Sequence, residues 1–495
     1  MNKRILTLLV ACLLLQCSEF EQNQNNILFI SIDDLRPELG AYGKTHIHSP
    51  NIDALASEGM VFKKAYVQQA VCGPSRTSIL TGLRPDGNKV TINPLHFRTT
   101  VPDVITLPQH FKNNGYHAVN IGKIYHGHDG TYNDSLSWSE PWWNAPPMYT
   151  NNIRGYLSYD NQQILAEINE NIDGINYHAS YWEAEDVPDN AYPDGMVVEK
   201  AIDVMHRIKD EPFFLAVGIE KPHLPFTCPK KYWDLYDPST IELAENYYPT
   251  KGETPYTTGN WGDLVHYYDS PSPETITDDI ARNVIHGYYA CTSYADALVG
   301  QLLDALEEFG LKENTIVVLW GDHGWKLGEH FMWSKSTNYE IDANAPIIIS
   351  YPDMEHKGTS TDAMVEFVDL YPTLADLAQL DLPSHLQGTS FVPVLENPSL
   401  EWKETVFSQY PRENGKVMGY SMKTNDYRYI RWENAETGEI LDRELYDHNK
   451  DYQENFNIAK LPESQPIIQN LDNHFEKAYN WAHLKSKKKI NGYKN

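Results

Sequence analysis

Short apolar runs separated by helix-like segments recur along the first three quarters of the chain. The clearest runs are residues 27–32 (ILFISI), 117–121 (HAVNI), 213–217 (FFLAV), 315–320 (TIVVLW) and 346–350 (PIIIS). Continuous apolar runs of this length are typical of strands buried on both faces of a parallel sheet. The segment 295–310 repeats leucine at helical spacing and ends at a glycine, as a helix does. The pattern predicts an α/β fold with a large, mainly parallel sheet sandwiched by helices.

The pattern changes after about residue 395. Segments 418–432 and 438–447 alternate polar and apolar positions and are joined by a charged turn, which predicts a small antiparallel sheet. A helix is expected around 466–484. We therefore predict a main domain over 25–395, a C-terminal subdomain over 396–485 and a basic tail over 486–495. Two long irregular stretches, 127–195 and 227–280, are interpreted as functional loops.

Polar side chains follow four of the predicted strands. Because the carboxyl ends of parallel strands share one edge of a sheet, residues far apart in sequence are expected to meet there. Taken singly, the acidic pair after the first strand fits a helix cap, and a histidine before a proline fits a structural role. Taken together, the carboxylates and the imidazole form an oxygen-dominated site that suits Ca²⁺ or Mg²⁺ better than zinc. The residues concerned are Asp33, Asp34, Lys123, His126, His223, Asp322 and His323.

Cys72 stands just before a Gly-Pro pair that suits the first turn of a helix. Backbone N–H groups at a helix start favour an anion, either a thiolate or a bound oxyanion, and Arg76 adds a positive charge one turn later. Cys72 is therefore a candidate nucleophile, and the alternative is a buried, inert cysteine. The phosphate loop of cysteine phosphatases is excluded, because it needs five residues between Cys and Arg and this chain has three.

The formal net charge of −28 argues against nucleic acid or an anionic membrane face as a partner. It also means that an anionic substrate has to be met by local cations or by a metal ion.

The sequence Cys72-Gly73-Pro74-Ser75-Arg76 followed by LTGLRP matches the C-x-P-S-R signature of type I sulfatases, members of the alkaline phosphatase superfamily. Matching segments extend over nearly all of the chain, and they most resemble the iduronate-2-sulfatase-like bacterial sulfatases. The resemblance implies an alkaline phosphatase-like fold. It also implies hydrolysis of sulfate esters by a formylglycine made from Cys72 by a formylglycine-generating or anaerobic sulfatase-maturating enzyme.

Carried over position by position, the resemblance implies one Ca²⁺ ion held by Asp33, Asp34, the modified Cys72, Asp322 and His323. Arg76, Lys123 and His126 would hold and activate the formylglycine hydrate. His223 and Lys335 would contact the sulfate and its bridging oxygen, with His223 as the general acid, or Lys335 if the two roles are exchanged. One hydroxyl of the hydrate attacks sulfur, and the second collapses to the aldehyde and expels sulfate.

The expected substrates are sulfated poly- or oligosaccharides that contain uronic acids, such as ulvan-type algal polysaccharide or glycosaminoglycan fragments. His96 and Arg98 are predicted near the bound substrate. Aromatic side chains of the long loops are expected either to stack on sugar rings or simply to pack: Trp138, Trp142, Trp143, Tyr149, Trp233 and Tyr236. The alternatives are a phosphohydrolase or phosphonate hydrolase of the same superfamily, and an inactive lipoprotein that binds sulfated glycans.

The first seventeen residues place Lys3 and Arg4 before a short apolar run, which is typical of a secretory signal peptide. Cys17 at its end resembles a bacterial lipoprotein cleavage site, and a plain signal peptide is the alternative. We therefore expect an exported protein, located in the periplasm or held at the outer membrane by a lipid on Cys17. The remaining cysteines are too few for a disulfide framework, although Cys228 and Cys291 are able to form one bridge.

Overall fold

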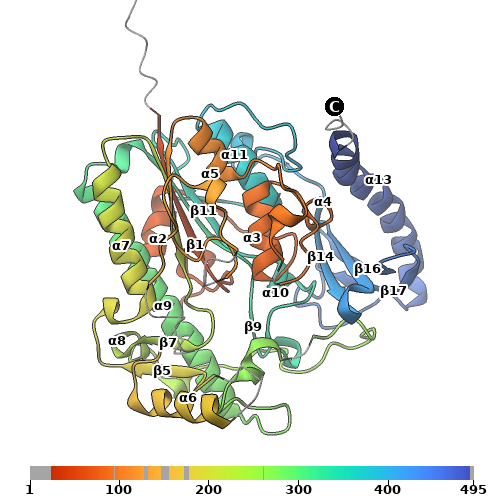
Figure 1. The fold of residues 1–495 in the computed structure, drawn as a ribbon. Helices are drawn as coiled ribbons and strands as arrows, with labels where there is room; N and C mark the ends of the chain where they lie inside the picture. Colours follow the sequence, from red (N-terminus) through yellow and green to blue (C-terminus); the bar gives the residue numbers. More distant parts are fainter. Residues whose placement is uncertain are drawn as a thin grey trace, which may run out of the picture.

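The computed structural model describes residues 24–93, 95–127, 132–145, 155–171, 178–259 and 261–490. Its centre is a seven-stranded sheet with the strand order β12-β2-β11-β8-β1-β6-β4 (Figure 1). None of the helices within these residues combines the length and apolar character that a membrane span needs. The strands are β1 (Asn26–Ile32), β2 (Met60–Phe62), β4 (His117–Gly122), β6 (Phe213–Ile219), β8 (Thr315–Gly321), β11 (Ile347–Ser350) and β12 (Thr359–Thr361).

The prediction of a mainly parallel sheet is confirmed, with one strand reversed. β4, β6, β1 and β8 pair in parallel, whereas β11 pairs antiparallel with both β8 and β2. The reason lies in the connection between β8 and β11, which has no long crossover helix. The chain leaves β8 at the carboxyl edge, makes only short elements, and re-enters the sheet from that same edge.

The central strands are buried on both faces because their alternate side chains enter two different cores. In β1, Leu28 and Ile30 face one core, and Ile27 and Phe29 face the other. The first core is covered by α2 (Pro50–Glu58), α7 (Pro193–Ile208) and α9 (Asp278–Glu308). The second is covered by α3 (Cys72–Thr81), α5 (Leu107–Asn113), α11 (Leu370–Leu377) and α12 (Val392–Glu396). Figure 1 shows the helices on the two sides of the sheet.

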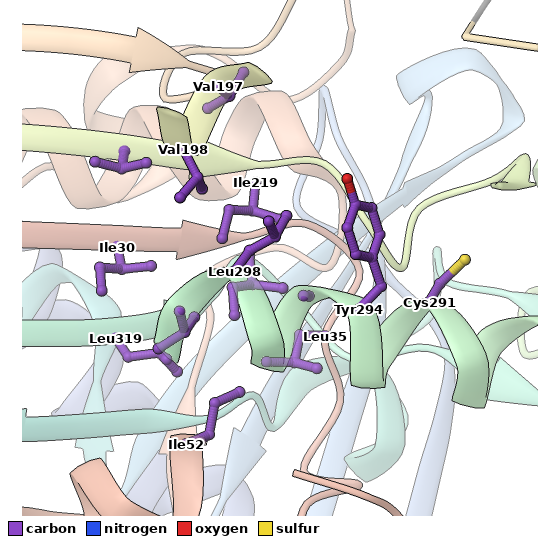
Figure 2. Close-up of a cluster of buried hydrophobic side chains, with 14 of the residues drawn as sticks. Ile30, Leu35, Ile52, Val197, Val198, Ile219, Cys291, Tyr294, Leu298 and Leu319 are labelled. Atoms are coloured by element: carbon purple, nitrogen blue, oxygen red, sulfur yellow. The ribbon is translucent and has the colours of Figure 1, made fainter. Parts of the chain in front are cut away.

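Figure 2 shows the first core, where Ile30, Ile219 and Leu319 of neighbouring strands meet Leu298 of α9. Cys291 of α9 is buried in this core, as is Cys228 of β7 (Phe226–Pro229). Both are free thiols, so the predicted alternative of a bridge between them is not realised in this structure. Burial and the neighbouring Cys291 raise the pKa of Cys228 well above its usual value.

The helix predicted over 295–310 is the second half of α9, which begins at Asp278 within a stretch expected to be irregular. Thr277 caps its start by accepting a hydrogen bond from the Ile280 amide. The two irregular stretches contain further short elements that their aromatic, proline-rich composition obscures. These are α6 (Tyr159–Asn171), β5 (Trp182–Glu185), which pairs with β7, and α8 (Lys230–Trp233).

The predicted C-terminal antiparallel sheet is confirmed. It has the order β14-β15-β16-β17 and packs Tyr429 and Leu445 against Leu471 and Phe475 of α13. Its strands are β14 (Val406–Arg412), β15 (Val417–Lys423), β16 (Tyr427–Asn434) and β17 (Ile440–Asp447). The helix α13 (Gln465–Ile490) continues into the predicted basic tail, whose last residues, 491–495, lie outside the described residues, as does the predicted signal peptide.

The C-terminal sheet is tied to the catalytic domain through Arg428 of β16. Its guanidinium is buried and contacts Glu340 of α10 (Glu340–Ala343) and Glu454, at 2.5 Å from Nε to the latter. His448 donates a second hydrogen bond to Glu454 at 2.8 Å. Through the contact of Arg428 with Glu340, the C-terminal subdomain packs against the segment between β8 and β11. The remaining short elements are β3 (Ala65–Tyr66), β9 (Lys326–Leu327), β10 (Trp333–Ser334), β13 (Val365–Glu366) and α4 (Pro85–Asn88).

Removing this buried cation should destabilise the fold in a pH-dependent way. Burial alone would raise the pKa of Glu454, but Arg428 and His448 lower it to about 2. Because the folded pKa is depressed, the pair stabilises the protein above the unfolded pKa, and this contribution is lost as the pH falls from about 5 towards 2. We expect Arg428→Met to lower the free energy of unfolding by about 3–5 kcal/mol at pH 7.

Chemical denaturation of both proteins at several pH values checks this. The difference between wild type and variant should narrow as the pH falls below about 5. Lys450→Met, which removes an exposed cation that pairs with Asp447 in the same subdomain, is the control and should change stability by less than about 0.5 kcal/mol. A difference that is independent of pH would contradict the role given to Glu454.

Candidate active site

The carboxyl ends of four adjacent strands converge at one edge of the sheet, as the sequence predicts. Asp33 follows β1, Lys123 follows β4, and Asp322 follows β8, while the segment after β6 leads to His223. Backbone hydrogen bonds continue past the strands: the Asp33 amide donates to Ile219 O at 3.1 Å. The acidic residues are therefore held by an extension of the sheet.

Asp34 turns away from the strand direction with φ = 58°, a left-handed conformation that aspartate tolerates better than most residues. Its amide donates to Asp322 Oδ1 at 2.9 Å, and its carbonyl accepts from the Tyr288 hydroxyl at 2.8 Å. The side chains of Asp33, Asp34 and Asp322 are fully buried. Three carboxylates thus share one small, dry volume.

Cys72 begins α3, and its Sγ lies 3.4 Å from Asp33 Oδ1 and 3.3 Å from His323 Nε2. His323 Nδ1 donates to the Gly324 carbonyl at 3.0 Å, which leaves the lone pair of Nε2 directed at this cluster. One donor atom each from Asp33, Asp34, Cys72 and His323 lie within 4.8 Å of one another. The arrangement is able to surround a metal ion.

Asp322, the fifth predicted ligand, is a hydrogen-bonded neighbour of this cluster. Its Oδ1 accepts from the Asp34 amide, and its Oδ2 accepts from Arg76 Nε at 2.8 Å. Arg76, one turn along α3, also donates through Nη1 to the carbonyls of Lys123 and Ile124. Its Nη2 is buried 3.4 Å from Asp33 Oδ1 and has no hydrogen-bond partner among the described residues. Arg76 thereby joins three strand ends.

Two lysines complete the set of cations. Lys123 forms an ion pair with Asp33, and Lys335 Nζ lies 2.9 Å from Asp34 Oδ1. The position of Lys123 depends on Gly218 of β6, because a Cβ at that residue would lie 2.1 Å from the Lys123 carbonyl oxygen. Both ammonium groups are buried beside carboxylates and remain charged, with their pKa values raised despite burial.

The raised pKa of Asp34 indicates that this carboxylate needs more positive charge nearby than Lys335 supplies. Burial raises the pKa of Asp34 well above its usual value, and repulsion from Asp33 and Asp322 adds to this, while Lys335 opposes it only in part. Burial and the Asp33 carboxylate also raise the pKa of the Cys72 thiol. The helix start at Cys72 therefore does not offset burial and the neighbouring carboxylate.

His223 presents one defined nitrogen to the site. Its Nδ1 donates to the Leu224 carbonyl at 2.6 Å, so Nε2 faces Asp34 at 3.8 Å and Asp263 at 3.9 Å. Burial, with the positive charges of Lys335 and Lys123, lowers the pKa of His223.

Asp263 is one residue of this site that the sequence does not reveal. Its Oδ2 lies 2.7 Å from Lys335 Nζ, and it belongs to the stretch 227–280. The only signal in the sequence is that this stretch is long, irregular and acidic.

The two predicted substrate contacts, His96 and Arg98, lie in different surroundings: His96 lines a pocket, and Arg98 bonds within the protein. His96 and His126 line a small pocket beside Gly73, together with Asn93 and Tyr132. Arg98 is directed into the protein instead: its five N–H donors are taken by Asp134, by Gln109 and by the carbonyls of Pro102 and Val104. We conclude that Arg98 braces this loop rather than facing a substrate.

Most of the predicted aromatic side chains also pack internally. Trp138 is buried, and Trp233 stacks on Trp182 with ring centroids 4.5 Å apart. Trp142 Nε1 donates to the Gly122 carbonyl at 2.8 Å, and the Trp143 backbone bonds along β4. The Tyr236 hydroxyl bonds Ser293. Tyr149 lies outside the described residues.

Comparison with known proteins agrees with this geometry. The sulfatase family model matches residues 25–380, and the model for the C-terminal region of N-sulphoglucosamine sulphohydrolase matches residues 328–480. The chain is 34% identical to iduronate 2-sulfatase of Mus musculus, over 84% of this chain and 86% of that protein.

Two solved structures share the fold. One is a protein in complex with its substrate D-glucosamine-2-N,6-O-disulfate, with a TM-score of 0.74 and 23% identity over 95% of this chain and 100% of the other. The second is a phosphonate monoester hydrolase from Silicibacter pomeroyi, with a TM-score of 0.73 and 21% identity over 92% of this chain and 95% of the other. The family model covers most of the chain, and the strand-end cluster and the C-terminal sheet accompany it: the chain belongs to the sulfatases of the alkaline phosphatase superfamily and is a sulfuric ester hydrolase.

Proposed function

We propose that this sulfatase hydrolyses sulfate esters of sulfated poly- or oligosaccharides that contain uronic acids, such as ulvan-type or glycosaminoglycan fragments, using a formylglycine at position 72 and one Ca²⁺ ion. The observation that carries the proposal is the position of the Cys72 side chain between Asp33 and His323, inside a shell of Arg76, Lys123 and Lys335. The uronic acid follows from the likeness to iduronate 2-sulfatase.

The donor set fits a hard divalent cation. Asp33 and Asp34 supply carboxylate oxygens, His323 supplies Nε2, and the atom carried by residue 72 completes the group, with Asp322 beside them. Buried adjacent carboxylates are costly without nearby positive charge, and oxygen-rich sites favour Ca²⁺ over zinc. A Ca²⁺ ion held here would supply positive charge to the sulfuryl oxygens.

Each side chain around position 72 has its own role in the proposed reaction. A formylglycine at this position supplies, as its hydrate, an oxygen nucleophile together with a second hydroxyl that permits release of sulfate. Lys123 and Nη2 of Arg76, which both lie beside Asp33, would donate to oxygens at this position, and His126 lies on the neighbouring wall beside Gly73. Lys335 binds the sulfuryl group. His223 directs Nε2 to the same space; as the imidazolium, which carries a proton on both ring nitrogens, it would give the Nε2 proton to the departing sugar oxygen.

The proposal also includes maturation and location. Residues 1–17 are proposed to direct export, with Cys17 carrying a lipid that holds the protein in the periplasm or at the outer membrane. A formylglycine-generating or anaerobic sulfatase-maturating enzyme is the proposed partner that oxidises Cys72. These features fit an enzyme that meets large sulfated polysaccharides outside the cytoplasm.

Position 72 is tested directly. Mass spectrometry of the peptide that contains Cys72, from protein made in its native host, should show the aldehyde in place of the thiol. Cys72→Ala should abolish sulfate release while unfolding stays cooperative, because the nucleophile is lost and the fold is not. Cys291→Ala, which removes a buried thiol of the first core that belongs to no predicted site, should keep activity and cost on the order of 1 kcal/mol of stability. An unmodified thiol in a protein that releases sulfate would contradict the proposal.

Metal removal should act on stability as well as on activity. We expect chelation to lower the unfolding temperature, because Asp33 and Asp34 lose their divalent counter-charge, and addition of Ca²⁺ to restore it. Saturation at about 100 times the dissociation constant corresponds to ~2.7 kcal/mol of stabilisation. Calorimetric melting with Ca²⁺, Mg²⁺ and Zn²⁺ in turn identifies the ion. A melting temperature indifferent to all three would refute the metal assignment.

Arg76 is expected to require its guanidinium and not merely its charge. A lysine ammonium is a single point and cannot hold Asp322 and the carbonyls of Lys123 and Ile124 together. Arg76→Lys should lower the free energy of unfolding by about 3 kcal/mol and reduce sulfate release more than about 100-fold. Arg207→Lys, in a half-exposed pair with Glu140, is the control and should change neither. Activity of Arg76→Lys within twofold of wild type would disprove this role.

A further inference from the structure

Asp263 contacts both residues that are proposed to receive the sulfate group. Its Oδ2 lies 2.7 Å from Lys335 Nζ and 3.9 Å from His223 Nε2. Lys335 is therefore shared between two carboxylates, Asp34 on the metal side and Asp263 on the other. The Asp263 side chain is 43% exposed, whereas Asp34 is fully buried. A negative charge thus stands at the solvent side of the sulfate-binding lysine.

This carboxylate is held in place by its neighbours in the chain. It belongs to the short 3-10 helix η6 (Gly262–His266), which is anchored by the buried side chains of Trp261 and Leu264. Gly262 has φ = 57°, and a Cβ there would lie 2.3 Å from Ser334 Oγ, so only glycine lets the segment approach Lys335 so closely. Contact between Asp263 and Lys335 is a built feature of the site.

The position of Asp263 has a consequence for the charge of the substrate. Two oxygens that bond to one ammonium nitrogen lie about 4.5 Å apart, so an ester anion bound to Lys335 would be that close to Asp263. Each negative charge on the bound ester therefore meets repulsion from Asp263, and a second ester charge doubles it.

We propose that Asp263 is a specificity-determining residue that selects monoanionic sulfate esters against dianionic phosphate esters. The proposal rests on the proposed function for the identity of the site but concerns binding and not turnover. The attraction of Lys335 is common to both kinds of ester. Repulsion by Asp263 grows with the charge of the bound group, at a distance where one extra charge changes affinity about tenfold in a partly hydrated site.

A matched pair of stable probes isolates this effect. Benzylsulfonate carries one negative charge and benzylphosphonate carries two at pH 9, and neither has an ester bond to hydrolyse. Their affinities for the Ca²⁺-supplemented full-length protein are measured by isothermal titration calorimetry. The variants are Asp263→Asn, which preserves shape, and Asp279→Asn, which removes a 97% exposed carboxylate at the start of α9 as the control.

For wild type and for Asp279→Asn, benzylsulfonate should bind more tightly than benzylphosphonate. In Asp263→Asn, the affinity for benzylphosphonate should rise about tenfold more than the affinity for benzylsulfonate. Asp263→Ala serves as a second variant, and melting temperature and metal content are measured for each protein. Sulfate release from a sulfated glycan, assayed separately, tests the proposed function independently of these affinities.

If Asp263→Asn changes both affinities by the same factor, so that the ratio of the benzylsulfonate affinity to the benzylphosphonate affinity stays at its wild-type value, the proposal is overturned and Asp263 has a purely positioning role. Loss of metal content in both Asp263 variants would identify Asp263 as a metal ligand instead. Failure of wild type to bind either probe would show that Lys335 does not form an anion site.

Discussion

Burial of Asp33, Asp34 and Asp322 in one volume is the constraint on which the rest of the site depends. Each carboxylate loses its hydration, and Asp34 is further repelled by its neighbours. The structure meets this cost with cations from distant parts of the chain: Arg76 from α3, Lys123 from the end of β4 and Lys335 from the segment before α10. Removal of Arg76 or of Lys335 leaves a buried carboxylate without its nearest cation, so the architecture that brings these segments together is also what the charges stabilise.

The same constraint explains how a strongly acidic protein receives an anion. The overall charge of −28 acts weakly through screening solvent, whereas the buried cations act at hydrogen-bond distance in a medium of low polarity. The C-terminal sheet contributes indirectly. Its Arg428 pairs with Glu340, the first residue of α10, and this helix follows the loop that carries Lys335. The subdomain therefore fixes one side of the site without supplying a described ligand to the metal cluster.

Much of this was predictable from sequence because burial leaves a clear pattern. Strands buried on both faces appear as continuous apolar runs, and the polar residues after them locate one edge, which is why Asp33, Asp34 and His323 were identified together. The direction of β11 was not predictable, because it depends on whether the chain crosses the sheet between β8 and β11. Lys335 and the proposed modification of Cys72 follow from family resemblance and not from any local pattern.

The surroundings of Asp263 and Arg98 could not be predicted from the sequence. Both are charged residues in loops, and nothing local distinguishes a carboxylate that meets Lys335 from an arginine whose five donors are spent on Asp134, Gln109 and two carbonyls. The difference arises from tertiary packing: Trp261 and Leu264 pin η6 to the core, and Gly262 allows the close approach to Ser334.

The pKa of the Cys72 thiol also depends on tertiary packing. A helix start in isolation favours a thiolate, but burial beside Asp33 reverses that preference and raises the pKa of the thiol. A protonated thiol in such a place is neither a strong nucleophile nor a hard ligand for a cation set among carboxylates. The proposed aldehyde hydrate is neutral and would offer oxygen to both the ester and a metal ion. The environment that raises the pKa of Cys72 is thus one in which the proposed oxygen-bearing side chain would have a function.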